Sequence, residues 1–436
     1  MKQRDSGEQD DLAVSLNQAL VDDLRNRASI RTPSIEVAFR AVLRHHFLPG
    51  RPLEDVYSNR AISAKQDEKG RWLSSSSQPD IMAIMLEQLD LQPGHRVLEI
   101  GTGTGYNAAL MAHIVGETGW VVTVDIDQDL VETAREHLKT AGIEQVELVC
   151  ADGGYGYPDA APFDRIILTV GAPDITPAWW HQLKPDGRLV LPLLLRGSMK
   201  SIAFEQVDDH LGSLSVNDCG FIPLRGDFAS TLAERVQLGP EPGLFIEPMD
   251  EFSIDTETVP SFLGDLTRDW PAGVEANVWD VLSGSLWTWL ALHERHMCKL
   301  FAEDDMLAQH SVPAVIVIEG KQRSGGTAVL LEKTGLAALV RAPGAAVPFV
   351  PADKLSAPGS PAVLPFSLFI RQYGADESIT RRLLAHIETW KAAGSPSSNR
   401  MSIRAYPKGF DYESDEGEIM IEKQWTKFVI EWPASG

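Results

Sequence analysis

A glycine-rich loop carries the strongest chemical signal in the chain. Gly101–Gly105 reads Gly-Thr-Gly-Thr-Gly, after a short apolar strand predicted at 96–100 and before a helical pattern at 106–115. Glycine lets the backbone approach a ligand closely, because no Cβ stands in the way. Dinucleotide-binding loops start in a similar way, but their spacing is Gly-x-Gly-x-x-Gly, and here the acid Glu99 precedes the loop. These two features together argue against a dinucleotide.

Two more acids follow the next two predicted strands. Asp125 ends the strand at 120–124, and Asp152 and Gly153 follow the strand at 146–150. Ligands of parallel sheets lie beyond the carboxyl ends of the strands, so these residues should lie near the glycine loop. Asp125 is placed to accept hydrogen bonds from two ribose hydroxyls, and Asp152 would meet an adenine amino group. Any one of these acids could instead cap the helix that follows it.

The elements that must position these residues form a regular pattern. Besides the three strands above, short apolar strands are predicted at 165–169 and 188–193, with helical patterns between the strands. Such alternation is typical of a doubly wound, Rossmann-like α/β sheet. Apolar residues also recur at helical spacing between residues 12 and 48, which predicts two or three short helices before the sheet. The glycines and acids fall where the strands of this sheet end.

The second half of the chain has a different pattern. Gly239–Gly243 reads Gly-Pro-Glu-Pro-Gly and predicts a linker. Beyond it, an amphipathic helix is predicted at 378–393, and short strands with glycine-bearing turns are predicted at 314–318, 327–331 and 337–340. We therefore expect two domains, an α/β domain at 1–226 and an α+β domain at 244–436.

The composition argues against several classes of function. The 436 residues carry a formal net charge of −22, whereas nucleic-acid binders collect Lys and Arg. No apolar run reaches the roughly 18 residues of a membrane span, and the first residues lack the apolar core of a secretory signal. The three cysteines are scattered without the spacing of metal ligands, which is typical of a reducing cytoplasm. We expect a cytoplasmic protein with no metal, nucleic-acid or membrane partner.

Several short segments, in the same order along the chain, resemble the protein-L-isoaspartate O-methyltransferase family. The segments that carry the resemblance are Arg44–Pro49, Ser76–Pro79, Val97–Tyr106, Ala161–Asp164, Val170–Ala172, Gln182–Pro192 and Phe221–Leu224. They cover about half of the chain, from residue 12 to residue 226. The resemblance implies a class I methyltransferase fold and S-adenosylmethionine as cofactor, with S-adenosylhomocysteine as product.

The resemblance also implies a role for single residues. Ser77 matches the serine whose hydroxyl sits beside the accepting carboxyl group, and we predict that it orients the carboxylate. Ser76 and Ile222 match positions near the bound peptide. The positions that match the cofactor site are Glu99, Gly101, Thr102, Gly103, Asp125, Asp152 and Gly153.

Two departures from the family pattern bear on the substrate. The segment Ala64–Leu73 is longer than usual and is expected to form a hairpin beside the peptide groove. The chain also continues far beyond residue 226, where the family ordinarily ends. This layout resembles variant methyltransferases encoded beside ribosomally made peptide natural products. In those, a chosen aspartate of a precursor peptide is methylated, and an added C-terminal domain helps to choose it.

Four functional hypotheses follow. The leading one is methylation of a specific aspartate in a modified peptide, which leads through a succinimide (aspartimide) to isoaspartate. The nearest alternative is a general protein-L-isoaspartate repair methyltransferase with an unusual appendage. A carboxyl methyltransferase for small molecules is a third, which the Ser-x-Pro and Phe-Ile-Pro-Leu segments oppose. The last is a peptide-binding module that carries an inactive methyltransferase, which the intact glycines and aspartates oppose.

Overall fold

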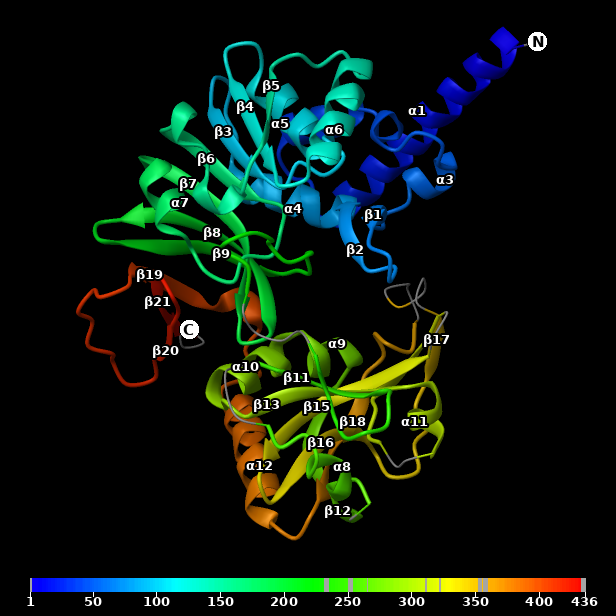
Figure 1. The fold of residues 1–436 in the computed structure, drawn as a ribbon, viewed down its shortest axis with the longest axis vertical. Coiled ribbons are helices and arrows are strands. Elements are labelled where there is room, and N and C mark those ends of the chain that lie inside the picture. Colours follow the sequence, from blue (N-terminus) through cyan, green and yellow to red (C-terminus); the bar gives the residue numbers. More distant parts are fainter. Residues whose placement is uncertain are drawn as a thin grey trace. The chain divides into compact units, whose positions relative to one another are not determined.

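The chain folds into two compact units (Figure 1). The first unit comprises Met1–Leu194, Met199–Ser230 and Ser402–Ile430, and the second comprises Leu195–Ser198, Thr231–Met401 and Glu431–Gly436. The computed structural model describes residues 2–230, 235–249, 254–264, 266–309, 312–320, 323–351, 355 and 360–432.

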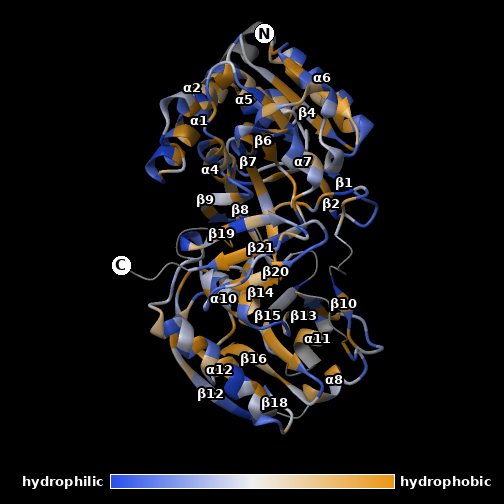
Figure 2. Cartoon of the chain, turned by 90° about the vertical axis from the view of Figure 1, so that its left-hand side faces the viewer, coloured by the Kyte–Doolittle hydropathy of each residue, from blue (hydrophilic) through white to orange (hydrophobic). Residues whose placement is uncertain are grey.

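A parallel sheet forms the centre of the first unit. Its strands stand in the order β5-β4-β3-β6-β7, and each neighbouring pair runs parallel. Their bounds are β3 (Arg96–Ile100), β4 (Trp120–Asp125), β5 (Val146–Cys150), β6 (Phe163–Leu168) and β7 (Leu183–Leu195). The doubly wound α/β fold expected from the alternating pattern is confirmed. The strand interiors are apolar, as the orange strands of Figure 2 show.

Helices cover one face of this sheet with a shared apolar core. The helices are α1 (Lys2–Asn26), α2 (Pro33–Ala41), α4 (Pro79–Leu89) and α5 (Tyr106–Val115). They pack against side chains of the central strands, namely Val97, Val121, Ile167 and Val190. Helix α5 is buried on nearly every side, so its sequence is apolar throughout rather than along one stripe. Among the described residues, no helix has the length and apolar character needed to cross a bilayer.

Short elements between α2 and α4 lead to the site. They are η1 (Arg44–Phe47), α3 (Leu53–Val56), β1 (Ile62–Gln66) and β2 (Trp72–Ser76). Strands β1 and β2 pair antiparallel, with Ile62 opposite Ser76, which confirms the predicted hairpin. Pro79 then occupies the first turn of α4, where a missing backbone N–H costs nothing.

The end of the chain returns to the first unit. Strands β8 (Ser198–Val207) and β9 (His210–Asp218) continue the sheet, and β19 (Ser402–Pro407) pairs antiparallel with β9. Strands β20 (Ile419–Glu422) and β21 (Thr426–Glu431) follow in the same sheet. The expected domain at 244–436 therefore differs from the observed unit, which lacks residues 402–430. An open edge of β9 would leave backbone groups without partners, and β19 covers it.

The second unit is a largely antiparallel sheet with helices, in agreement with the expected α+β class. The strand order is β10-β11-β13-β15-β16-β18-β12, and β14 and β17 pair beside β15. The strands are β10 (Val236–Gln237), β11 (Leu244–Pro248), β12 (Leu266–Ala276), β13 (Met297–Glu303), β14 (Ile316–Glu319), β15 (Ser324–Glu332), β16 (Gly335–Arg341), β17 (Phe349–Pro351) and β18 (Phe366–Tyr373). The helices are α8 (Val259–Phe262), α9 (Val278–Leu282), α10 (Ser285–His293), α11 (Asp304–Gln309) and α12 (Glu377–Ala392).

Two local patterns were misleading. Apolar residues recur at helical spacing from Asn277 to Phe301 and favour a helix there. In the structure α10 ends at His293, and Met297–Glu303 is a strand with alternating burial. Pairing with β11 and β15 decides its structure over the local helical spacing. The sequence of Gly220–Gly226, Gly-Phe-Ile-Pro-Leu-Arg-Gly, also predicts a short strand. In the structure it forms only a single parallel bridge, between Gly171 and Pro223.

Candidate active site

A pocket of about 610 Å³ opens at the carboxyl ends of β3 and β4. This volume falls within the usual range for small-molecule sites. Most of the residues predicted from the sequence line it together, namely Ser76, Ser77, Gly101, Thr102, Gly103, Asp125, Gly153 and Ile222. Glu99, which is fully buried, and Asp152, which is half-buried, are not among the lining residues.

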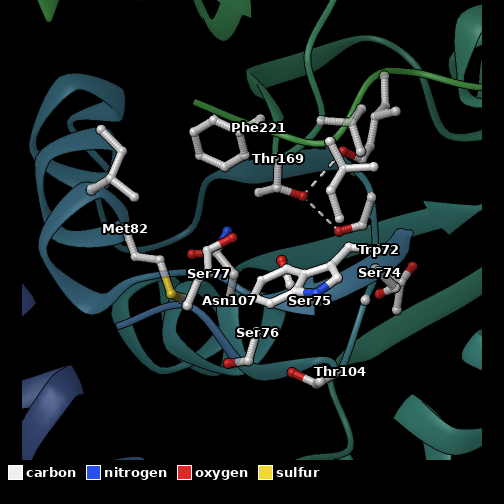
Figure 3. A pocket seen from close by; sticks show the side chains of 18 of the residues that line it. Trp72, Ser74, Ser75, Ser76, Ser77, Met82, Thr104, Asn107, Thr169 and Phe221 are labelled. Carbon is white, nitrogen blue, oxygen red and sulfur yellow. Dashed lines mark hydrogen bonds between the residues drawn. The ribbon is translucent and has the colours of Figure 1, made fainter. Parts of the chain in front are cut away.

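The glycine loop is required by close packing on both sides. Gly101 has φ +105°, and a Cβ there would lie 2.5 Å from Thr169 Oγ1. That hydroxyl donates a hydrogen bond of 2.7 Å to the carbonyl oxygen of Gly101, dashed in Figure 3. Gly103 has φ +53°, and a Cβ there would lie 3.3 Å from the carbonyl oxygen of Ser75. Any larger residue would therefore displace one wall of the pocket.

Asp125 ends β4 with its carboxylate at the pocket. One oxygen accepts a hydrogen bond from the backbone N–H of Gly103 at 3.1 Å, and the other accepts one from that of Asp127 at 3.2 Å. The residue is only 8% exposed, and burial raises the pKa of its carboxyl. Each carboxylate oxygen has a further lone pair, so the group can still accept hydrogen bonds from a ligand.

Glu99 supports the loop from inside the protein. Its side chain is fully buried, and its two oxygens accept hydrogen bonds from Asn107 Nδ2 at 2.8 Å and Thr123 Oγ1 at 2.6 Å. Burial raises the pKa of Glu99 to about 7. Thr102 Oγ1 in turn lies 2.9 Å from Thr123 Oγ1, so the network reaches the glycine loop. The acid therefore connects β3, β4 and α5 directly beneath the pocket.

Asp152 fixes the turn that carries Gly153. Its oxygens accept hydrogen bonds from the backbone N–H groups of Gly154 at 2.8 Å and Asp227 at 2.7 Å. A Cβ on Gly226, which has φ +98°, would lie 2.2 Å from an Asp152 oxygen. A Cβ on Gly153 would likewise lie 2.4 Å from a side-chain carbon of Ile100. This corner of the pocket is therefore built around a carboxylate and two glycines.

The four consecutive serines Ser74–Ser77, here called the serine segment, form another wall of the pocket. Figure 3 shows them with Trp72, Met82 and Phe221. Ser76 is 3% exposed, and its Oγ accepts from the guanidinium of Arg44 at 3.2 Å. Ser77 is half-buried, and within the described residues its hydroxyl makes no hydrogen bond. The Ser77 hydroxyl is therefore available to a bound molecule, whereas that of Ser76 is engaged.

Ile222 lines the pocket from the segment that follows β9. Its carbonyl oxygen accepts a hydrogen bond of 2.8 Å from the N–H of Gly171, and the N–H of Leu224 donates to the carbonyl oxygen of Gly171 at 2.8 Å. These two bonds hold the segment beside the backbone that follows β6, in place of the expected strand.

Sequence reasoning missed three charged residues around the pocket. Arg44 was noted only as part of a motif, and its contacts behind the serine segment had no local signal. Lys65 and Arg225 both form ion pairs with Asp127, at 2.9 Å and 2.8 Å. These partners are far apart in the sequence, so no spacing rule connects them.

Comparisons with known proteins agree on one family. Residues 15–228 match the model of the family described as protein-L-isoaspartate(D-aspartate) O-methyltransferase. A protein-L-isoaspartate O-methyltransferase of Methanopyrus kandleri is 37% identical over 222 residues, which are 50% of this chain and 96% of that protein. One of Thermotoga maritima is 39% identical over 207 residues, which are 47% of this chain and 65% of that protein.

Solved structures carry similar names. A protein-L-isoaspartate O-methyltransferase aligns with a TM-score of 0.48 at 23% identity, over 89% of this chain and 96% of the other. One from Plasmodium falciparum, described as putative and in complex with S-adenosyl-L-homocysteine, aligns with a TM-score of 0.43 at 18% identity, over 48% of this chain and 98% of the other.

The sequence match is the decisive comparison, because it covers nearly all of the Methanopyrus kandleri protein at 37% identity. The family match at residues 15–228 includes the glycine loop, Asp125 and Ser77. The chain therefore belongs to the protein-L-isoaspartate O-methyltransferase family of S-adenosylmethionine-dependent carboxyl O-methyltransferases.

Proposed function

We propose that this protein methylates the free carboxylate of isoaspartyl residues in proteins, with S-adenosylmethionine as methyl donor. The observation that carries the proposal is that Ser77, the glycine loop and Asp125 line the same pocket. Within the family match, these residues offer a nucleoside site and a carboxylate site beside each other.

For the cofactor, the pocket offers a backbone cradle and an acid. Gly101 and Gly103 leave the space that a Cβ would otherwise fill, and Thr102 lies between them. We assign the ribose hydroxyls to Asp125 and the adenine side to Gly153. Glu99 and Asp152 act indirectly in this assignment, since their oxygens already accept hydrogen bonds from the protein.

On the acceptor side, the reaction depends on the position of the accepting carboxylate more than on proton transfer. An aspartyl-type carboxyl has a pKa near 3.9 and is ionised at neutral pH, so no general base is required. Bound S-adenosylmethionine supplies a methyl group on a positively charged sulfur. Transfer of that methyl group to a carboxylate oxygen would give a methyl ester and S-adenosylhomocysteine. Ser77 would donate a hydrogen bond to the other carboxylate oxygen and hold the reacting atoms about 3–3.5 Å apart.

The apolar side chains around the serine segment have a separate role. Trp72, Met82 and Phe221 limit the access of water to the reacting atoms. Charges that neutralise each other in the reaction gain from a drier environment. Methoxide leaves from the resulting ester far more readily than oxide leaves from a carboxylate. The next backbone nitrogen can therefore attack the ester carbonyl, expel methanol and close a succinimide. Hydrolysis of the succinimide then gives aspartate or isoaspartate.

A second candidate is methylation of one chosen aspartate in a ribosomally made, modified peptide, through aspartimide to isoaspartate. Two observations favour it. The β1–β2 hairpin places Trp72, which is 43% exposed, at the pocket. All of the second unit except Leu195–Ser198 also lies beyond the family match, which ends at residue 228. The names of the relatives support repair more directly, so repair is the main proposal.

Matched peptides test the main proposal. The full chain is incubated with S-adenosylmethionine and two peptides that differ only in one aspartyl or isoaspartyl linkage, and methyl esters are counted by mass spectrometry. We expect esters on the isoaspartyl peptide only, and none with Asp125→Ala. Failure to methylate either peptide would contradict the proposal, and selective esterification of ring-constrained aspartyl peptides would favour the second candidate.

A further inference from the structure

A buried arginine lies directly behind the serine segment of the pocket. The Arg44 side chain is 0% exposed. Its Nη2 donates to the carbonyl oxygens of Ser77 at 2.9 Å and of Ser76 at 3.3 Å. Nη2 and Nε also reach Ser76 Oγ, at 3.2 Å and 3.4 Å. One guanidinium therefore holds the backbone carbonyl groups of Ser76 and Ser77 and the hydroxyl of Ser76.

The same guanidinium holds the loop that follows α3. Nη1 donates to the carbonyl oxygens of Val56 at 2.8 Å and Ser58 at 3.2 Å, and Nη2 donates to that of Arg60 at 3.2 Å. The guanidinium is planar and presents its N–H groups in fixed directions. Its contacts therefore fix the serine segment relative to this loop, which a flexible lysine could not do in the same way.

The backbone of Ser77 has little other support. Ser76 is the last residue of β2 that pairs with β1, and α4 begins at Pro79. Ser77 therefore stands between two regular elements and belongs to neither. Its carbonyl oxygen is held by Arg44.

The charge of Arg44 is also unusual for so buried a residue. Among the described residues, no carboxylate forms an ion pair with it, and its partners are carbonyl and hydroxyl oxygens. Burial lowers the pKa of Arg44 to about 10, so the group is still charged at neutral pH. A buried charge without an acid beside it carries a cost in desolvation. A neutral core residue would fill the same space without that cost.

We infer that Arg44 is a positioning residue that fixes Ser77 at the pocket surface, so that the Ser77 hydroxyl meets the accepting carboxylate. This inference rests on the proposed function of the same pocket. Misplacing a reacting group by about 1 Å can lower the rate on the order of 100-fold. Loss of the guanidinium should therefore slow turnover at saturating peptide more than it weakens cofactor binding.

The test compares Arg44→Lys and Arg44→Met with the full-length parent. Arg51→Met serves as a matched control, because Arg51 is exposed and its Nη2 donates to the carbonyl oxygen of Ser63. We expect kcat on an isoaspartyl peptide to fall about tenfold to 100-fold in both Arg44 variants. The affinity for S-adenosylhomocysteine, measured by calorimetry, should stay within about twofold of the parent. Arg44 acts on the residue that meets the peptide carboxylate, so its loss should leave the cofactor site unchanged.

A double-mutant cycle separates positioning from a general loss of structure. If Arg44 acts through Ser77, then Arg44→Lys should cost little further rate in a Ser77→Ala background. Equal costs of Arg44→Lys in both backgrounds would overturn the inference. Wild-type kcat in folded Arg44→Lys and Arg44→Met would overturn it too. If neither variant folds, Arg44 serves stability alone, which also overturns it.

Amide hydrogen exchange decides the question without any substrate. We expect faster exchange at residues 74–80 in Arg44→Lys and unchanged exchange at residues 99–105, because only the first of these segments accepts hydrogen bonds from the guanidinium. A parent protein that methylates no isoaspartyl peptide would defeat the proposed function, yet these exchange rates would still test the positioning role. Unchanged exchange at residues 74–80 would overturn the inference.

Discussion

Lys65 and Asp127 join two walls of the pocket, with Lys65 Nζ 2.9 Å from Asp127 Oδ2. Lys65 also lies 2.7 Å from Asp129 Oδ1, and Arg225 Nη2 lies 2.8 Å from Asp127 Oδ2. The β1–β2 hairpin, the loop after Asp125 and the segment after β9 are therefore connected by ion pairs beside the proposed ribose site. Opening any of these walls requires at least one of the pairs to break.

We expect Lys65→Met to speed the release of S-adenosylhomocysteine. The Lys65 and Asp127 side chains are 28% and 18% exposed, so solvent screens the pair and the effect is modest. Partly exposed pairs contribute roughly 0–1 kcal/mol, which corresponds to an increase of at most about fivefold in the dissociation rate. Stopped-flow measurements at two salt concentrations check this, and the variant should be less sensitive to salt than the parent. Lys69→Met on the same hairpin is the control, and equal rates for both variants would refute the role of Lys65.

Ser77→Ala should lower turnover and leave cofactor binding nearly unchanged. The hydroxyl is available at the pocket and makes no hydrogen bond to the described protein. Loss of one hydrogen bond to a charged group costs about 1.5–3 kcal/mol, or roughly tenfold to 100-fold in kcat. Steady-state kinetics and calorimetry on the same preparation check the two parts. A variant as fast as the parent would show that another group orients the carboxylate.

The stability of the protein should depend on pH through Glu99. Its folded pKa is raised to about 7 by burial, from an ordinary value of 4.5, so the folded state holds the proton more tightly. The resulting stabilisation is fully present below pH 4.5 and is lost as pH rises through 7. Glu99→Gln keeps the size of the side chain without the charge. We expect its unfolding free energy to vary less between pH 5 and pH 8 than that of the parent, in denaturant titrations at each pH. An identical pH dependence in both proteins would contradict the assignment.

The sequence was informative wherever function imposes a local pattern. The glycine loop between β3 and α5 has strand, turn and helix signals in one short window, so its structure followed from spacing alone. The alternation of strands and helices likewise predicted the parallel sheet. Asp125 was predicted at a strand end, and the structure places its carboxylate at the pocket.

Long-range contacts were outside the reach of such patterns. Arg44 meets Ser77 through a fold that no local spacing encodes. Glu99 matches a position of the cofactor site, and its oxygens accept hydrogen bonds from Asn107 and Thr123 beneath the loop, which no local pattern predicts. An acid at a strand end can point to either side of the sheet, and only packing decides which. For the same reason, the pairing of β19 with β9 was not visible in the sequence.

That pairing leads to a prediction about the C-terminal segment. Asp174 is 3% exposed, and its oxygens accept hydrogen bonds from the N–H groups of Ile175 at 2.7 Å and Trp425 at 2.8 Å. Asp174→Ala leaves these donors without their acceptor, and each buried unpaired group costs about 1–3 kcal/mol. We expect a loss of roughly 2–4 kcal/mol in unfolding free energy by denaturant titration, because the N–H of the half-buried Trp425 regains part of its solvation. The exposed Asp159→Ala is the control and should change little. A chain that ends at residue 226 loses the same contact along with β19, β20 and β21, so we expect this shortened chain to aggregate. A stable, monodisperse product would show that the first unit does not need the C-terminal segment.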